Sequence, residues 1–467
     1  MATYAELVKR RNEIMTRAIG FDFAQFENGG LAFDYERMMS NAGYSLAEMT
    51  RIQKDVGVGD TPLLELRNIT RLARKFAPPG KGARIFLKDE ASNPSGSFKA
   101  RRAAISVYHA ARKGYKGVAA ATSGNYGAAV ASQAAMRGLK CIILQEVYDS
   151  RGIGQPEILE KGRACEAYGA EVLQLTVGPE LFALFLGVLD ETGFFNASLY
   201  TPFGIAGIET LGVELSEQLV ARTGRNPDVV VVTHAGGGNV TGTARGLQKA
   251  GAHSTQIIGA SVDLSGLHMA SDKDFNRKSF TTGHTGFGMP FTTWPDRTDV
   301  PRNAARSLRY LDRYVTVTQG EAFYVTEMLA QLEGLERGPA GNIALAAAFV
   351  LAQELDAEQT IVVQETEYTG AGKHPNAQMA FAREQGIEVR LGDPRDSKPG
   401  TNIIIPEQAE QLSVREVNLD DLRRSYLRNA LERKNGVPLS EIEIEFLCED
   451  SRASREFVLR MAQGYVS

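Results

Sequence analysis

The chain has 467 residues, 43% of them hydrophobic, and a formal net charge of -4 from 52 basic and 56 acidic residues. This length predicts two packed lobes. The near-balanced charge argues against nucleic acid or an acidic membrane surface as the main partner. The amino terminus lacks the apolar core of a signal peptide, and no apolar run is long enough to span a bilayer. The three cysteines, Cys141, Cys165 and Cys448, lack metal-ligand spacing, which predicts reduced thiols, no metal site and a cytoplasmic protein.

Residues 1–60 are mixed polar and helical and are predicted to form a helical extension. A strand-like run at 85–87 then leads into the loop 93–99, Asn-Pro-Ser-Gly-Ser-Phe-Lys, and the pattern predicts a helix over 100–111. A lysine amine attacks an aldehyde only when it is held, partly desolvated, beside its target, and small residues allow that approach. Lys99 is therefore a candidate nucleophile; the alternative is a solvent-facing lysine in a helix-capping loop.

A second polar loop lies between a strand-like run at 118–121 and an alanine-rich helix expected over 128–137. Its residues are Thr122, Ser123, Gly124 and Asn125. A strand–loop–helix junction points free backbone N–H groups at an anion, and the hydroxyl and amide side chains add further donors. Taken alone, the same residues are also typical of a simple helix cap.

A third loop follows four consecutive valines at 229–232, which predict a buried parallel strand. It contains Gly236, Gly237, Gly238, Asn239 and Val240, and a helix follows it. Glycines without Cβ atoms allow the backbone to wrap a phosphate, and the helix dipole favours its negative charge. The alternative is a degenerate dinucleotide fingerprint with Asp263 on a ribose, but no hydride-accepting constellation accompanies it.

The last third of the chain adds a strand-like run at 361–363, a Thr-Gly loop at 368–373 and a helical region over 392–467. Amphipathic helices are expected over 422–434 and 454–463, and their apolar faces are expected to pack on their own chain rather than dock a partner subunit. Two histidines adjoin the loops, His234 and His374. Each is a candidate acid or base, with a structural histidine as the alternative.

Several motifs in their order along the chain resemble the fold type II pyridoxal-phosphate enzymes, which include threonine synthase, cysteine synthase and the tryptophan synthase beta subunit. Besides the three loops, these are the segments 61–63, 88–90, 200–211 and 332–335. The resemblance spans roughly residues 60 to 375. It implies an α/β fold of two lobes, with parallel-rich sheets covered by helices on both faces, plus extensions at both ends.

The resemblance also implies residue roles. Lys99 would bind pyridoxal 5'-phosphate covalently, Asn125 would hydrogen-bond its ring hydroxyl, and Thr369 would face its pyridine nitrogen. The cofactor's phosphate would be held by the backbone of Gly236, Gly237, Gly238, Asn239 and Val240. The substrate's α-carboxylate would be held by Thr122, Ser123 and Gly124.

The implied domain organisation has a smaller lobe over 96–215 and a larger, cofactor-binding lobe formed by 61–95 and 216–391. The helical extension at 1–60 and the helical appendage at 392–467 flank these lobes. The whole-length pattern, including the segment 367–374, is most similar to the pyridoxal-phosphate (beta) subunit family of 2-amino-4-oxopentanoate thiolase.

That similarity implies thiolytic cleavage of 2-amino-4-oxopentanoate with coenzyme A to alanine and acetyl-CoA in ornithine degradation. The enzyme would be cytoplasmic, pair with a small alpha subunit and form homodimers. Alternatives are a threonine-synthase-like or β-replacement enzyme acting on O-phosphohomoserine or serine, a lyase or deaminase acting on serine or threonine, and an oxidoreductase. A further alternative, of another class, is a non-catalytic cofactor-binding regulatory subunit.

Overall fold

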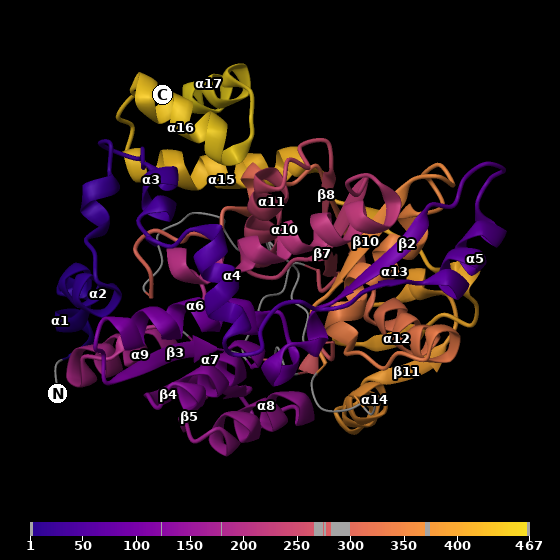
Figure 1. The fold of residues 1–467 in the computed structure, drawn as a ribbon, viewed down its shortest axis with the longest axis horizontal. Helices are drawn as coiled ribbons and strands as arrows, with labels where there is room; N and C mark the ends of the chain where they lie inside the picture. The colour runs from indigo at the N-terminus through magenta and orange to yellow at the C-terminus, as the bar shows by residue number, and fades with distance from the viewer. Residues whose placement is uncertain are drawn as a thin grey trace.

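The computed structural model describes residues 3–122, 124–178, 180–265, 274, 277–281, 299–368 and 374–464. Two parallel-rich sheets organise it (Figure 1). The larger has seven strands in the order β1-β2-β10-β7-β8-β9-β13, antiparallel only at its two edges. Its strands are β1 Leu63–Glu65, β2 Arg84–Asp89, β7 Val229–Thr233, β8 Gln256–Val262, β9 Arg313–Val317, β10 Thr360–Glu365 and β13 Arg415–Glu416.

Helices cover both faces of the larger sheet because its inner strands are apolar on both sides. One face carries α5 Arg67–Phe76, α12 Gln319–Glu333 and α13 Pro339–Leu351. The other carries α10 Pro202–Thr223 and α11 Gly238–Lys249. These two helices touch backbone to backbone, since a Cβ at Gly246 would lie 2.1 Å from the Glu209 carbonyl oxygen.

The smaller sheet has four parallel strands in the order β5-β4-β3-β6. Its strands are β3 Gly117–Thr122, β4 Lys140–Tyr148, β5 Glu171–Thr176 and β6 Phe195–Asn196. The helices that alternate with them are α6 Lys99–Arg112, α7 Asn125–Met136, α8 Pro156–Ala167 and α9 Glu180–Thr192. This unit lies beneath α10 and α11 in Figure 1, so loops from both sheets can meet between them.

Peripheral elements complete the fold. A two-stranded parallel sheet pairs β11 Glu388–Leu391 with β12 Asn402–Ile405, and α14 His374–Glu384 precedes it. The short 3₁₀ turns are η1 Phe23–Phe26, η2 Glu90–Ser92, η3 Pro94–Gly96, η6 Ser307–Arg309, η7 Pro394–Asp396 and η8 Ala409–Gln411. Among the residues that the structure describes, none of the helices has both the length and the apolar character needed to cross a bilayer.

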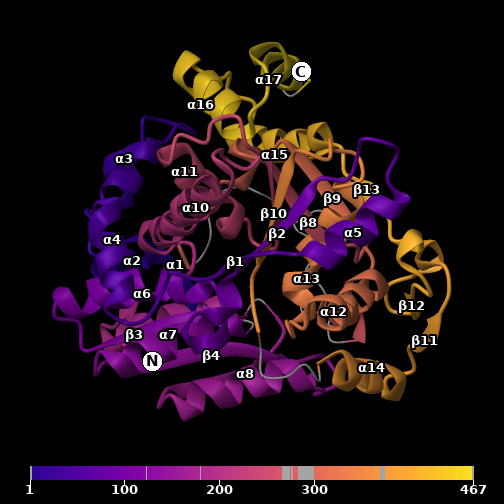
Figure 2. The same cartoon turned by 45° about the vertical axis from the view of Figure 1, so that its right-hand side comes forward.

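The two ends of the chain form helical extensions that pack against each other (Figure 2). The amino-terminal helices are α1 Tyr4–Lys9, α2 Arg11–Ile19, α3 Tyr35–Ser40 and α4 Leu46–Lys54. The carboxyl-terminal helices are α15 Leu419–Lys434, α16 Glu441–Ser451 and α17 Arg455–Gln463. The Leu31 N–H donates to Glu443 Oε1 at 2.9 Å, which ties the two extensions together.

The predicted strands and the helices around the three loops are present, with differences at the carboxyl end. α15 begins at Leu419, three residues before the expected start, and ends at Lys434, with Asn435 as a left-handed C-cap. Helix α16 is not predicted from the sequence, because its Glu-Ile-Glu-Ile-Glu run alternates as a strand does. A capping box between Ser440 and Glu443 starts the helix instead.

Candidate functional site

The candidate site lies where neighbouring parallel strands end. β2, β10 and β7 are adjacent, so their carboxyl ends, and the loops that follow them, meet at one edge of the larger sheet. Such an edge is the usual place for a ligand in an open α/β sheet. The loop after β2 carries Lys99, and the loop after β7 carries the three glycines.

Lys99 opens α6 and is half-buried. Although part of its side chain remains accessible, the protein around the ammonium group desolvates it and lowers its pKa to about 7. The nearby charges of Lys161 and Arg102 act in the same direction, while the carboxylate of Glu367 opposes them. At neutral pH a large fraction of this amine is therefore unprotonated and nucleophilic, as the prediction for Lys99 requires.

The Lys99 loop is fixed to the segment that follows β10. The Phe98 N–H donates to the Thr366 carbonyl at 3.1 Å, and the Tyr368 N–H donates to the Gly96 carbonyl at 2.7 Å. Gly96 has φ +70°, and a Cβ there would lie 2.2 Å from the Tyr368 oxygen. Glycine is thus required where the two backbones meet.

A buried ionic cluster holds the start of α6 in place. The guanidinium of Arg101 donates to Glu90 at 2.7 Å and pairs with Glu214 at 3.0 Å, and Lys88 lies 2.5 Å from the same Glu214 carboxylate. Arg101, Lys88 and Glu90 are completely buried. Buried charges require partners, so this cluster ties β2, α6 and α10 into one rigid support for Lys99.

The second loop places Asn125 at the start of α7, as expected. Its amide Nδ2 donates to Glu367 Oε2 at 3.2 Å. Thr122 Oγ1 accepts the N–H groups of Gly124 at 2.9 Å and Gly127 at 3.2 Å, so it braces the loop. Asn125 at the cofactor's ring hydroxyl, and Thr122 and Gly124 at the substrate's carboxylate, stay predictions.

Two predicted site residues, Ser123 and Thr369, lie outside the described residues, as does the Thr-Gly loop from 369 to 373.

The glycine loop is packed too closely for any side chain. A Cβ on the first, second or third glycine of 236–238 would lie 2.0 Å from the Tyr200 hydroxyl, 2.5 Å from the Ser307 hydroxyl and 2.0 Å from Arg102 Nη2, respectively. The second glycine also has φ +80°. Packing by Tyr200, Ser307 and Arg102 thus favours glycine at all three positions, which lie at the amino terminus of α11, where helices bind anions.

Polar groups beside this loop fit a phosphate. Both polar atoms of the buried Asn239 side chain, and Nε of the buried Arg102, have no hydrogen-bond partner among the described residues. Burial lowers the pKa of Arg102 to about 10, which still leaves it a cation at neutral pH. An anionic group would satisfy such donors, so this part of the structure fits the cofactor that the sequence implies, with Val240 buried behind it.

His234 is poorly suited to acid or base chemistry. It is buried, its Nε2 lies 2.9 Å from Ser307 Oγ, and burial lowers its pKa to about 3. The ring is thus neutral at physiological pH and already engaged. The side chain of His374 lies outside the described part of the structure.

The cysteines offer no activated thiolate. Burial raises the pKa values of Cys141 and Cys165 to about 12, and burial also raises that of Cys448. A thiol nucleophile requires a lowered pKa.

Two acidic residues at the end of β10 escape the sequence analysis, Glu365 and Glu367. Both side chains are buried, and Glu367 contacts Asn125. Their position in the sequence is the one signal for this burial. They stand at the end of an apolar strand and next to the Thr-Gly loop, where burial is expected although charged residues are usually exposed.

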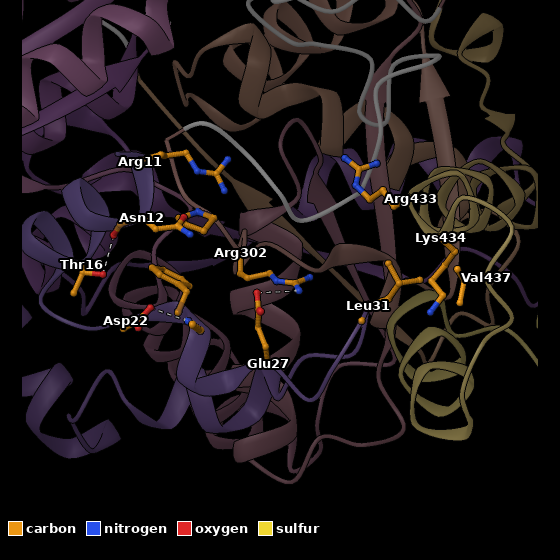
Figure 3. A pocket seen from close by; sticks show the side chains of 14 residues that line it. Arg11, Asn12, Thr16, Asp22, Glu27, Leu31, Arg302, Arg433, Lys434 and Val437 are labelled. Carbon is orange, nitrogen blue, oxygen red and sulfur yellow. Dashed lines mark hydrogen bonds and ion pairs between the residues drawn. The ribbon is translucent and has the colours of Figure 1, made fainter. Parts of the chain in front are cut away.

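A separate cavity of about 450 Å³ lies between the two extensions (Figure 3). Two of its basic residues are already paired, Arg302 with Glu27 at 3.4 Å and Lys434 with Glu443 at 2.8 Å. None of the three site loops contributes to the wall that the described residues form. This cavity lies at the interface of the two extensions and is separate from the candidate site.

Comparison with known proteins agrees with this geometry. Residues 54–367 match the family described as "Pyridoxal-phosphate dependent enzyme". The "2-amino-4-ketopentanoate thiolase beta subunit" of an unknown prokaryotic organism is 66% identical over 98% of this chain and 97% of its own length. The protein of the same name from Acetoanaerobium sticklandii is 65% identical with the same coverage. The crystal structure of the T.th. threonine deaminase matches with a TM-score of 0.53 and 25% identity, covering 70% of this chain and 98% of that protein.

Proposed function

Because this chain belongs to the pyridoxal-phosphate dependent enzymes, in the family of the 2-amino-4-ketopentanoate thiolase beta subunits, we propose that it cleaves 2-amino-4-oxopentanoate with coenzyme A. The products are alanine and acetyl-CoA. The observation that carries the proposal is the identity of 65–66% over nearly the whole chain, extensions included. The half-buried Lys99 amine with its lowered pKa supports it.

The net reaction forms an S–C4 and a C3–H bond and breaks the thiol S–H and the C3–C4 bond. The sulfur of coenzyme A forms a bond to C4 of the substrate, the C3–C4 bond breaks, and the thiol proton ends on C3, which becomes the methyl carbon of alanine. When bound, the cofactor would supply the sink for the electron pair left on C3 as the C3–C4 bond breaks. Lys99 Nζ would bind the cofactor's aldehyde and move the proton at Cα, while the glycine loop and Asn239 would hold its phosphate.

The chain's own cysteines need no part in this scheme. Cys141 and Cys165 are buried, and their pKa values of about 12 keep them protonated. Coenzyme A therefore attacks the carbonyl directly, without an acyl-cysteine step.

The relatives' name "beta subunit" supports an alpha subunit as partner. That this subunit is small, and that the chain also forms homodimers, are further parts of the proposal. A cytoplasmic location is part of the same proposal, supported by three cysteine thiols that form no disulfide with one another.

The test replaces Lys99 with Ala in the full chain, assembled with its alpha partner and supplied with both substrates. Acetyl-CoA formation should be abolished, because the substitution removes the amine that would bind the cofactor and move the proton at Cα. Lys113→Ala, an exposed lysine just beyond the same helix, should retain full activity. Appreciable turnover by the Lys99→Ala variant would contradict the assignment.

A spectral titration separates the alternative substrates without requiring the partner. The visible absorption of the cofactor-loaded chain should change on adding 2-amino-4-oxopentanoate and stay constant with O-phosphohomoserine, serine or threonine. A response to O-phosphohomoserine or serine alone would instead indicate a threonine-synthase-like or β-replacement enzyme.

A further inference from the structure

Glu367 lies on a backbone segment that is locked to the Lys99 loop. It follows β10, and it forms an antiparallel bridge with Ser97, two residues before the lysine. The hydrogen bonds of Thr366 and Tyr368 to this loop flank the bridge on both sides. The position of Glu367 relative to Lys99 is therefore set by the backbone and does not depend on side-chain rotamers alone.

The carboxylate of Glu367 is buried and only half satisfied. Its side chain is 1% exposed, Oε2 accepts from Asn125 Nδ2 at 3.2 Å, and Oε1 has no hydrogen-bond partner among the described residues. A Cβ at Gly338 would lie 2.0 Å from Oε1, so this glycine leaves the space that the carboxylate fills. An unpaired buried carboxylate oxygen is costly, so the cofactor-loaded site should supply a partner for it.

One other carboxylate, Glu157, also raises the pKa of Lys99, but it has an ion-pair partner. It pairs with Lys161 on the same helix, α8, at 2.5 Å, so the charges of these two residues offset each other. Glu367 makes no ion pair among the described residues. It is thus the carboxylate whose charge is left to act on Lys99.

A second buried carboxyl, Glu365, faces Glu367 but does not compete with it. Burial, together with the charges of Glu367 and Asp89, holds the pKa of Glu365 well above its usual range, which favours its uncharged form. Asp89 is itself paired with Arg337 at 2.5 Å.

We propose that Glu367 is a positioning residue of the candidate site: it orients the Asn125 amide and supplies the negative charge that balances the Lys99 nitrogen. It acts through these two residues and needs no direct contact with substrate. The inference rests on the proposed cofactor-binding role of Lys99, but not on which amino acid the enzyme cleaves.

The test is a pH titration of the visible absorption of the cofactor-loaded full chain, which reports protonation of the nitrogen that joins Lys99 to the cofactor. Glu367→Gln removes the charge and keeps the shape. Because an opposite charge nearby favours the protonated form, its loss should lower the midpoint by about 1 pH unit or more. Glu367→Asp, which keeps the charge, should shift the midpoint less.

Glu365→Gln is the matched control, since it replaces a buried carboxyl two residues away whose raised pKa favours the uncharged form. Its midpoint should equal that of the wild type. Equal midpoints for Glu367→Gln and the wild type would overturn the proposal, as would an equal shift in both Gln variants. Because no substrate or coenzyme A is added, this result is independent of whether the proposed thiolysis is correct.

Gly338→Ala keeps the test decisive if Glu367→Gln fails to fold or to bind the cofactor. Gly338 has an ordinary φ of -77°, so alanine fits the backbone, but its methyl group would displace the Glu367 carboxylate. The midpoint should fall in this variant too, and an unchanged midpoint would overturn the proposal.

Discussion

The reactivity expected of Lys99 comes from its surroundings and not from the residue type. An ordinary lysine has a pKa near 10.5, whereas burial beside Lys161 and Arg102 lowers that of Lys99 to about 7. The same surroundings contain Glu367, which limits the decrease. The site thus balances two requirements: an amine neutral enough to attack the cofactor, and a nitrogen that can still carry a proton afterwards.

This balance has a measurable consequence for cofactor capture. The rate at which cofactor-free protein binds pyridoxal phosphate should rise with pH through a midpoint of about 7 and then level off, because only the neutral amine attacks. Stopped-flow absorbance would follow it. A rate that keeps rising towards pH 10 would contradict the lowered pKa. Lys161→Gln should move the midpoint upward, since it removes a positive charge close to Lys99.

Helices α10 and α11 illustrate how packing between elements supports the site. α11 begins at the glycine loop, and α10 carries Glu214 of the ionic cluster below Lys99. The two helices approach so closely at Gly212 and Gly246 that a Cβ at either would lie within 2.2 Å of the other helix's backbone oxygen. The glycine loop is therefore held in place by a contact well down the helix that follows it.

Gly246→Ala should force these helices apart. Overpacking of this kind costs about 1–3 kcal/mol, so the free energy of unfolding measured with denaturant should fall by that order. Gly187→Ala is the control within α9: the nearest atom to its new Cβ is 3.7 Å away, and removing a helical glycine should leave stability equal or raise it by about 0.5–1 kcal/mol. Equal stabilities of the two variants would argue against the close contact.

Elements with a local signal could be predicted from the sequence, and contacts between distant segments could not. Four consecutive valines mark β7, and three glycines mark the loop after it. The pairing of Asn125 with Glu367 joins residues far apart in the chain and depends on how β10 lies beside β2. Helix α16 could not be predicted for a different reason. Its alternating Glu-Ile pattern is typical of a strand, whereas tertiary packing of Ile444 selects the helix.

At the scale of the whole molecule, the two extensions are joined by buried charged groups. Glu443 of α16 accepts from the Leu31 N–H, which links the first and last parts of the chain, and from Lys434 of α15. Arg306, which directly precedes η6, pairs with Asp450 beside Tyr426 and so holds α16 against the rest of the chain. The threonine deaminase that matches 70% of this chain is itself covered to 98%, so the extensions lie largely outside the shared fold.

The Glu443 contacts should depend on pH. Burial opposes its ionisation, but hydrogen bonds from Lys434, Ser440 and Leu31 outweigh it and lower the pKa from 4.5 to about 2. Its contribution is therefore complete above pH 4.5 and lost as pH falls towards 2. Glu443→Gln should lower the thermal midpoint at neutral pH, and the gap to wild type should narrow over that acid range.

Glu441→Gln provides the control on the same helix. Glu441 pairs with Arg455 on the surface, where ion pairs contribute little, so its thermal midpoint should match the wild type at every pH. A Glu443→Gln gap that stays constant into acid would show that the carboxylate's charge has no part in joining the extensions.

The strand order of the larger sheet also governs when the protein can fold during synthesis. The smaller sheet draws all its strands from one continuous stretch, so it can assemble as soon as β6 leaves the ribosome. In the larger sheet, β2 cannot form its parallel pair until β10 has been synthesised. One edge of β9 likewise stays unpaired until β13 is synthesised near the end of translation. Unpaired strand edges invite aggregation, so a stalled or truncated nascent chain would expose the half of the protein that positions Lys99.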